Sequence, residues 1–176
     1  MKKSIVFIIN PTSGTTKKAN LPTLIERNLD KNSFDYEIIY TQRPKHATEI
    51  ATKASQENTT IVVAVGGDGT INEVAQGLVN TDTILGIVPM GSGNGLARHL
   101  KIPLKTGKAI ARLNDLTNLK IDTCTLNGQL FLCTSGVGFD AEVGYQFAQA
   151  KSRGFKTYLK VGFAAFLNYK IQEYEI

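Results

Sequence analysis

The sequence predicts an α/β protein whose strands form one parallel sheet. Apolar runs of strand length alternate between residues 4 and 100 with segments that have the period of a helix. Single helices separate neighbouring runs, which is the arrangement of right-handed βαβ units. Segments rich in glycine follow two of the runs directly, where a ligand would meet the carboxyl ends of parallel strands.

The expected elements follow from the spacing of apolar residues. Strands are predicted by apolar runs bounded by turn residues, and helices by apolar positions three and four residues apart. Strands of this kind, buried on both faces, belong to a sheet covered by helices on each side. The expected strands are Ser4–Ile9, Tyr36–Thr41, Thr60–Val65 and Ile84–Val88, and the expected helices are Leu21–Leu29, Ala47–Gln56, Ile71–Leu78 and Ser92–Leu100.

The pattern after Asn118 changes to that of a hairpin followed by two helices. Leu119–Leu126 and Gln129–Thr134 are the expected strands, and the Asn127-Gly128 pair between them favours a type I′ turn. A last strand is expected at Ile171–Ile176, and a strand without its sheet is an unusual terminus. We therefore expect the chain to be part of a longer protein.

The two cysteines lie on this hairpin. A turn of two residues pairs Cys124 with Phe131 and Cys133 with Asp122. The cysteines are then diagonal neighbours, about 7–8 Å apart, whereas a disulfide needs Cα atoms about 4.4–6.8 Å apart. We expect two reduced thiols in the core.

The composition favours a globular chain with an anionic partner. It has 176 residues, 42% of them hydrophobic, which is enough for a core. Its net charge of +5 suits a nucleotide or an acidic membrane surface. The apolar run Val161–Leu167 is much shorter than the roughly 20 residues of a membrane span. Asn10-Pro11 ends Ile5–Ile9 too early for a signal peptide, so we expect a cytoplasmic protein.

The most informative motif is the turn Gly66-Gly67-Asp68-Gly69-Thr70, between a strand and a helix. Glycine allows positive φ angles and the close approach of an anion, and the helix N-terminus offers N–H groups. Asp68 would repel a phosphate unless a cation lies between them or it accepts a proton from an attacking hydroxyl. The motif therefore indicates phosphoryl transfer. The structural alternative is a capping box, with Thr70 as N-cap and Glu73 three residues later.

Two further loops are expected at the same edge of the sheet, because the carboxyl ends of parallel strands lie together. One is Asn10-Pro11-Thr12-Ser13-Gly14 and the other runs from Pro89 to Gly95, while a fourth loop begins at Thr41. The Pro89–Gly95 loop holds three glycines, whose backbone entropy a plain connection would not need to lose. Its Ser92 either caps the next helix or contacts a phosphate.

Other catalytic motifs are missing from the sequence. It has no Gly-x-x-x-x-Gly-Lys-Ser/Thr segment, which excludes a Walker loop. It has no Gly-x-Ser-x-Gly elbow, and two histidines without metal-ligand spacing do not predict a zinc site. Arg98 and His99 stand together at a helix end, where a charged pair is usually solvated rather than catalytic.

Three motifs occur together in a specific order: Asn-Pro-x-Ser-Gly at 10–14, Gly-Gly-Asp-Gly-Thr-x-Asn-Glu-Val at 66–74 and Pro-x-Gly-Ser-Gly-Asn at 89–94. They resemble the diacylglycerol kinase catalytic domain of bacterial lipid kinases and sphingosine kinases. The resemblance implies a parallel-sheet nucleotide-binding domain of the phosphofructokinase/NAD-kinase-like type. It implies that ATP, with Mg²⁺, phosphorylates the hydroxyl of diacylglycerol or a related lipid alcohol at the inner face of a membrane, and it implies no nucleic-acid partner.

By this resemblance ATP lies across the three glycine loops. Asp68 is the implied catalytic acid, acting on the metal or on the attacking hydroxyl, and no other metal ligand is expected in this chain. The residues implied to bind ATP are Asn10, Pro11, Ser13, Gly14, Thr41, Gly66, Gly67, Asp68, Gly69, Thr70, Asn72, Glu73, Gly91, Ser92, Gly93 and Asn94.

The resemblance also implies two domains. Residues 1–118 form the nucleotide-binding domain, and residues 119–176 begin a β-rich lipid-binding domain, for which Thr134–Ala141 resembles the start. Family members carry a further acid and magnesium-binding residues in that domain, and these have no counterpart here. The activity of this chain by itself is therefore in doubt.

Basic and apolar residues near the C-terminus allow two interpretations each. Lys151, Arg153 and Lys156 are placed like basic residues that face phosphates in sphingosine kinases, or they form a solvated helix face. The aromatic stretches Phe155–Leu159 and Phe163–Phe166 cover the lipid cleft or belong to the core, and the core is favoured.

Two rival functions stay open. The Gly-Gly-Asp-Gly loop also occurs in NAD kinases and phosphofructokinases, which phosphorylate soluble substrates, although the other two loops argue against both. A non-catalytic nucleotide-binding module is the second rival. The sequence selects neither the lipid nor the oligomeric state, and a homo-oligomer is compatible with it.

Overall fold

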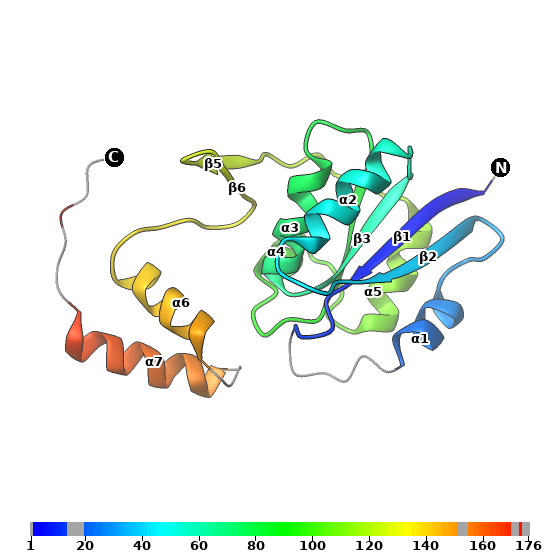
Figure 1. The fold of residues 1–176 in the computed structure, drawn as a ribbon. Coiled ribbons are helices and arrows are strands. Elements are labelled where there is room, and N and C mark those ends of the chain that lie inside the picture. Colours follow the sequence, from blue (N-terminus) through cyan, green and yellow to red (C-terminus); the bar gives the residue numbers. More distant parts are fainter. Residues whose placement is uncertain (1, 14–19, 151–154, 170–172, 174–176) are drawn as a thin grey trace. The chain divides into compact units, whose positions relative to one another are not determined.

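The computed structural model describes residues 2–13, 20–150, 155–169 and 173. The chain separates into two compact units, Met1–Leu132 and Cys133–Ile176. The first unit is built on a four-stranded parallel sheet in the order β2-β1-β3-β4 (Figure 1). The predicted α/β class with one parallel sheet is confirmed. The domain boundary expected after residue 118 stays a prediction.

The strands and helices of the sheet alternate along the chain as predicted. The four strands are close to their expected bounds, and the helices between them follow the expected order. The strands are β1 (Lys3–Ile9), β2 (Phe34–Tyr40), β3 (Ile61–Gly66) and β4 (Ile84–Pro89), and the helices between them are α1 (Leu21–Asn28), α2 (His46–Gln56) and α3 (Asp68–Leu78).

Helices cover both faces of the sheet because neighbouring side chains of a strand point in opposite directions. On one face, Phe7 of β1 belongs to a buried cluster that includes Ile25 of α1 and Ile110 of α5 (Thr106–Arg112). On the other face, Ile8 belongs to a second cluster that includes Val74 of α3 and residues of α2 and α4 (Gly95–His99). The sheet is therefore the middle of three layers.

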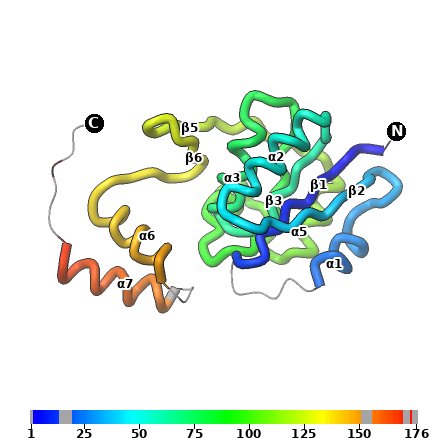
Figure 2. The backbone as a smooth tube through the Cα atoms, in the orientation of Figure 1, coloured from blue at the N-terminus to red at the C-terminus, as the bar shows by residue number. Residues whose placement is uncertain are grey.

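The path of the chain creates a switch point between β1 and β3. The first crossover leads from β1 to β2 on one side, and the next returns past β1 to β3 on the other side (Figure 2). The helices that follow β1 and β3, α1 and α3, consequently pack on opposite faces. Ligands of open parallel sheets bind beyond the carboxyl ends of the strands at such a switch point.

Two helices after β4 differ from the prediction. The helix expected at Ser92–Leu100 is shorter, since α4 spans only Gly95–His99. The helix α5 and the 3₁₀ turn η1 (Leu113–Asp115) were not predicted. The helix α5 has few apolar residues, which gives a weak helical pattern. Of these residues, Ala109 and Ile110 are buried.

The hairpin near residue 127 forms with the predicted turn but with shorter strands. Only β5 (Cys124–Leu126) and β6 (Gln129–Phe131) pair, and Cys124 lies opposite Phe131 as expected. Asn127 and Gly128 have φ angles of 49° and 73°, which a type I′ turn requires. Cys124 and Cys133 are both exposed, so the prediction that they lie in the core is wrong. The hairpin is too short and open to bury them.

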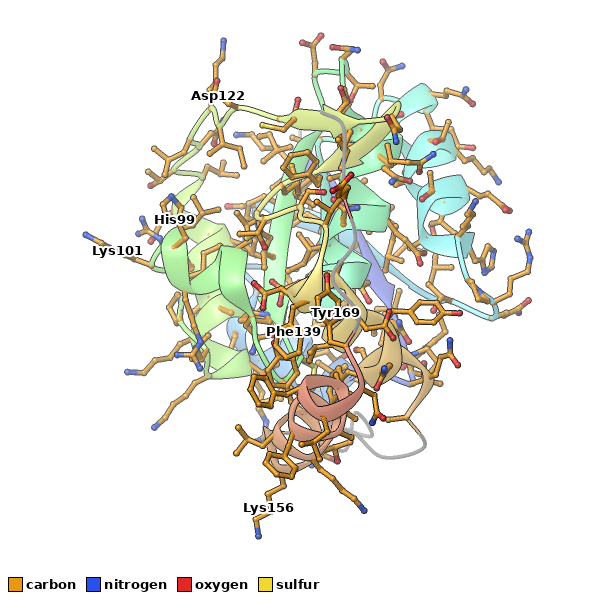
Figure 3. The ribbon with its side chains drawn as sticks, turned by 90° about the vertical axis from the view of Figure 1, so that its left-hand side faces the viewer. His99, Lys101, Asp122, Phe139, Lys156 and Tyr169 are labelled. Atoms are coloured by element: carbon orange, nitrogen blue, oxygen red, sulfur yellow. The ribbon has the colours of Figure 1, made fainter. Side chains whose placement is uncertain are left out.

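The described part of the second unit consists of α6 (Phe139–Gln149) and α7 (Phe155–Asn168). The rings of Phe139 and Tyr169 meet edge to face with centroids 5.4 Å apart (Figure 3). Phe163 and Phe166 are exposed, so the prediction that they belong to the core is wrong for this chain. None of the described helices has the length and apolar character needed to span a bilayer. The strand expected at 171–176 lies outside the described residues, apart from Glu173, which has no strand geometry.

Candidate functional site

The loops that follow the four strands begin at the same edge of the sheet. Ile9 is in register with Tyr40 on one side and with Val65 on the other, and Gly66 is in register with Pro89. Backbone hydrogen bonds continue just past these ends: the N–H of Thr41 donates to the Ile9 carbonyl at 2.9 Å, and that of Met90 to the Gly66 carbonyl at 2.7 Å. The predicted convergence of the loops is confirmed.

The loops after β1, β3 and β4 are called the first, second and third loops. Asn10 connects the first loop to α3, the helix that follows the second loop. Its Nδ2 donates to Thr70 Oγ1 at 3.1 Å, across the switch point between β1 and β3. Its Oδ1 accepts hydrogen bonds from the backbone N–H and the hydroxyl of Thr12, at 3.0 and 2.9 Å, which holds the loop in an Asx turn. Asn10 therefore orders the first loop around its own side chain.

Thr70 is not the N-cap that the capping-box interpretation expected. The helix α3 begins at Asp68, three residues earlier than predicted, and its N-cap is Gly67. Thr70 is buried in the first turn, where its hydroxyl accepts the hydrogen bond from Asn10. Gly67 has no side chain to cap the helix, and no side-chain hydrogen bond takes its place. The N-terminus of α3 is therefore open to an anion. The positive end of its helix dipole lies at the loop edge, the edge of the sheet where the loops after the four strands begin.

The second and third loops pack against each other through glycine backbone. A Cβ on Gly91 would lie 2.5 Å from Gly67 Cα, and a Cβ on Gly66 would lie 2.5 Å from Thr70 Oγ1. These glycines are needed for close approach rather than for positive φ, which among the described glycines occurs only at Gly128 and Gly138. A Cβ on Gly69, by contrast, would meet no atom within 4 Å. The space above Gly69 is open.

Asp68 bridges the second and third loops. It is the first residue of α3, and its Oδ1 accepts a hydrogen bond from the backbone N–H of Leu96 at 3.3 Å. Its Oδ2 lies 3.3 Å from the position of a Cβ on Gly93. The carboxylate is only half-buried, so it stays accessible at the loop edge while its orientation is restrained.

Asn94 fixes the shape of the third loop. Its Oδ1 accepts the N–H of Gly91 at 2.8 Å and its Nδ2 donates to the Gly91 carbonyl at 2.9 Å. Its backbone is left-handed, with φ 54°, a conformation that asparagine tolerates better than most residues. Asn94 is buried and precedes α4, which has no side-chain cap. Of the two alternatives for Ser92, the helix cap is therefore wrong, while contact of the exposed Ser92 with a phosphate stays a prediction.

The remaining predicted site residues fall into three groups. Ser13 and Thr41 are half-buried at the loop edge, while Pro11 is exposed. Asn72 and Glu73 instead meet other elements: Asn72 Nδ2 donates to the Leu130 carbonyl of β6 at 3.1 Å, and the backbone carbonyl of Glu73 accepts the Thr48 hydroxyl at 2.8 Å. Gly14, Lys151 and Arg153 lie outside the described residues.

The loop after β2 carries a separate ion pair. The two terminal guanidinium nitrogens of Arg43, Nη1 and Nη2, donate to the carboxylate of Glu49 at 2.7 and 2.6 Å. These hydrogen bonds hold the pKa of Glu49 below its ordinary value and raise that of Arg43. Both side chains are exposed, so the pair orders the loop that begins at Thr41 more than it stabilises the fold.

The carboxylate at this edge fits a metal ion that is also coordinated by the phosphates of a nucleotide. The described residues contain no group of three His, Cys, Asp or Glu side chains that could hold an ion. Mg²⁺ is commonly bound through one or two carboxylates together with substrate phosphates. Asp68 supplies one accessible carboxylate beside an open helix N-terminus, which suits a metal bound to a nucleotide rather than one held by protein alone.

Sequence reasoning missed a contact of Arg98 with the loop that follows β4. Arg98 and His99 are both exposed at the end of α4, and Figure 3 shows the side chains of His99 and Lys101 directed outward. The Nε of Arg98, however, donates to the Gly93 carbonyl at 2.9 Å. The sequence holds no local signal for this hydrogen bond, because it depends on α4 beginning at Gly95 rather than at Ser92.

Comparisons with known proteins point to one family. The model of the diacylglycerol kinase catalytic domain matches residues 4–126. A protein of Streptococcus pneumoniae serotype 4, provisionally named a lipid kinase, is 44% identical over 135 residues, covering 74% of this chain and 45% of the relative. A diacylglycerol kinase of Staphylococcus carnosus is 32% identical over 149 residues, covering 83% of this chain and 48% of the relative.

A solved structure shares the fold. The crystal structure of a diacylglycerol kinase from Bacillus anthracis superposes with a TM-score of 0.68 at 26% identity, covering 85% of this chain and 57% of that one. The fold is the α/β fold of these diacylglycerol kinases. The chain belongs to the diacylglycerol kinase catalytic domain family, and it spans about half the length of the curated relatives that it matches.

Proposed function

We propose that the full-length protein is an ATP-dependent kinase that transfers the γ-phosphate to the hydroxyl of diacylglycerol or a related lipid alcohol. The observation that carries this proposal is the position of Asp68, an accessible carboxylate at the open N-terminus of α3 where two glycine loops meet. Phosphoryl transfer depends chiefly on positioning and charge stabilisation, and this edge offers both.

The nucleotide would lie across the switch point, with its phosphates above Gly69. The open space there and the uncapped start of α3 suit a phosphate chain, whose charge the helix dipole stabilises. Asn10, Ser13 and Thr41 are at the same edge, where they would line the nucleotide. Asn94 and Thr70 would contribute by holding the loops rather than by contact with ATP.

Asp68 would act on the acceptor side of the phosphates. In the reaction the lipid hydroxyl oxygen forms a bond to the γ-phosphorus, the bond to the β–γ bridging oxygen breaks, and ADP leaves. A carboxylate within reach of the hydroxyl accepts its proton. Mg²⁺ bound to ATP would neutralise phosphate charge, and among the described residues Asp68 is a carboxylate at this edge that could contact it.

The rest of the protein would complete the site. We infer a first domain at residues 1–118 and a second, β-rich lipid-binding domain that begins at residue 119. The lipid would be met at the inner face of a membrane by a cytoplasmic protein in peripheral contact with it, and the net charge of +5 favours an anionic surface.

The test is ATP turnover by the full-length protein with Mg²⁺ against a panel of lipid alcohols, with NAD and fructose 6-phosphate as soluble controls. Phosphate on one lipid supports the proposal and names the substrate. Phosphate on a soluble control would show instead a kinase of the NAD-kinase or phosphofructokinase kind. ATP binding without any turnover would show a non-catalytic nucleotide-binding module.

A further inference from the structure

Arg98 is tied to the segment that faces the Asp68 carboxylate. The side chain starts on α4 and returns to the third loop, where its Nε donates to the Gly93 carbonyl at 2.9 Å. The backbone N–H of Arg98 donates to the Asn94 carbonyl at 3.0 Å, so the residue is anchored at both its backbone and its side chain. This makes Arg98 a brace between α4 and the loop before it.

Both oxygens of the Asp68 carboxylate face the segment that Arg98 braces. Oδ1 accepts the Leu96 N–H at 3.3 Å, and Oδ2 lies 3.3 Å from the position of a Cβ on Gly93. Gly93 and Leu96 stand on either side of Asn94, whose side chain fixes only the Gly91 end of the loop. The Gly93 end is held by the hydrogen bond from Arg98.

A shift of Gly93 would change the carboxylate directly. The Leu96 hydrogen bond is long, so a small movement of the loop weakens it, and hydrogen bonds lose strength steeply as their geometry departs from the optimum. Catalytic groups must be held close to their productive geometry by neighbouring residues, and small displacements reduce rates strongly.

We propose that Arg98 is a positioning residue, which orients Asp68 for phosphoryl transfer by holding the Gly93 carbonyl. This inference rests on the proposed role of Asp68. It makes a distinct claim, because Arg98 acts through the loop and contacts neither the phosphates nor the acceptor. If Arg98 were only a solvated side chain, its loss would change neither the Asp68 carboxylate nor turnover. If it bound phosphate directly, its loss would lower the affinity for the nucleotide.

The first test follows the Leu96 backbone amide of this chain by ¹H–¹⁵N NMR, without any need for activity. Asp68→Asn defines the amide shift when the carboxylate is lost. Arg98→Ala moves the Leu96 resonance in the same direction, and Arg98→Lys restores part of the shift. The matched control is Arg112→Ala, since Arg112 is an exposed arginine at the end of α5 whose hydrogen bond is to Asp115 in the following 3₁₀ turn η1. A Leu96 resonance unchanged in Arg98→Ala would overturn the proposal.

The second test measures turnover in the full-length protein. Arg98→Ala lowers kcat at least tenfold while KM for ATP stays within about twofold, and Arg98→Lys recovers part of kcat. A rise in KM for ATP with kcat unchanged would show direct phosphate binding and overturn the positioning role. An inactive wild-type protein would contradict the proposed kinase function. The Leu96 resonance would then still show whether Arg98 affects the position of the Asp68 carboxylate.

A double variant separates positioning from general damage. Gly93→Ala places a Cβ against Asp68 Oδ2, so it disturbs the same carboxylate. If both residues act on Asp68, Gly93→Ala combined with Arg98→Ala lowers kcat no further than the more severe single variant, apart from a factor of about two. Effects that multiply would show that the two residues act independently, which would contradict the proposal.

Discussion

The two units of the chain use their apolar residues differently. In the first unit, helices cover both faces of the sheet, and Phe7 and Ile8 are fully buried on opposite faces. In the described part of the second unit, Phe163 and Phe166 are 68% and 71% exposed. Apolar spacing shows which face of a helix favours burial, but a core needs a second layer to cover that face.

The two units also differ in how firmly side chains hold their loops. The first unit holds a rigid sheet, and its loop edge is connected by side-chain hydrogen bonds from Asn10, Asn94 and Arg98. A preorganised site needs such support. The second unit offers an apolar helix face without a defined edge of this kind among its described residues. The candidate site therefore lies in the first unit.

The largest contrast is expected for core substitutions. Phe7→Ala should lower the free energy of unfolding by about 3–5 kcal/mol, because it removes a fully buried ring from the first unit. Phe163→Ala is the matched change in the second unit, and its effect should stay within about 0.5 kcal/mol. Urea denaturation of the 176-residue chain followed by circular dichroism measures both. Equal losses would contradict the difference between the units.

Glycine substitutions sharpen the comparison within the loop edge. Gly91→Ala should destabilise the chain by about 1–3 kcal/mol, since its Cβ would overlap the Gly67 backbone. Gly69→Ala should leave stability within about 1 kcal/mol, because the space is open and alanine favours a helix.

The Gly69→Ala variant also tests where the phosphates of ATP lie. If they occupy the space above Gly69, Gly69→Ala weakens ATP binding at least tenfold in a calorimetric titration while the thermal midpoint barely changes. Normal ATP affinity in a folded Gly69→Ala variant would place the phosphates elsewhere.

A smaller effect is expected where the hairpin meets α3. Asn72→Ala removes the hydrogen bond from Nδ2 to the Leu130 carbonyl, which should cost about 1 kcal/mol. Amide exchange in the β5–β6 hairpin should become faster, while exchange in β1 and β3 stays the same. Exchange that accelerates equally in the sheet would mean that Asn72 supports the whole unit rather than the hairpin.

The smallest effect concerns pH. The pKa of Glu49 is lowered by its hydrogen bonds from Arg43, so the pair's contribution is fully present above the ordinary value of 4.5 and is lost as pH falls through the lowered pKa. Glu49→Gln should remove this part of the acid dependence with little change near neutrality. Denaturation curves between pH 7 and 3 compare the two proteins; an identical acid dependence would show that the pair is not formed in solution.

Much of the first unit follows from local sequence. The strands of the parallel sheet, their order of alternation and the Asn127-Gly128 turn depend on residue type and spacing, and these were predicted within a few residues. The start of α3 was predicted too late because Gly69 is a weak helix former, although Asp68 in the first turn is favoured by the helix dipole.

Other features depend on contacts that spacing does not contain. The close packing of Gly67 on Gly91 joins loops far apart in sequence, and the Arg98 hydrogen bond requires α4 to begin three residues later than predicted. The exposure of Cys124 and Phe163 reflects surfaces without a covering layer. The roles of the predicted ATP-binding residues stay predictions, although the loops that carry most of them do converge.

The most direct test of the account compares wild-type and Asp68→Asn full-length protein for transfer of labelled γ-phosphate from ATP to a lipid alcohol. The carboxamide keeps the size of the side chain but removes its charge and its capacity to accept a proton. We expect lipid phosphate from the wild type and at least a hundredfold less from Asp68→Asn, with both proteins equally folded. Equal turnover by the two would contradict the role given to Asp68 and, with it, the account of the site.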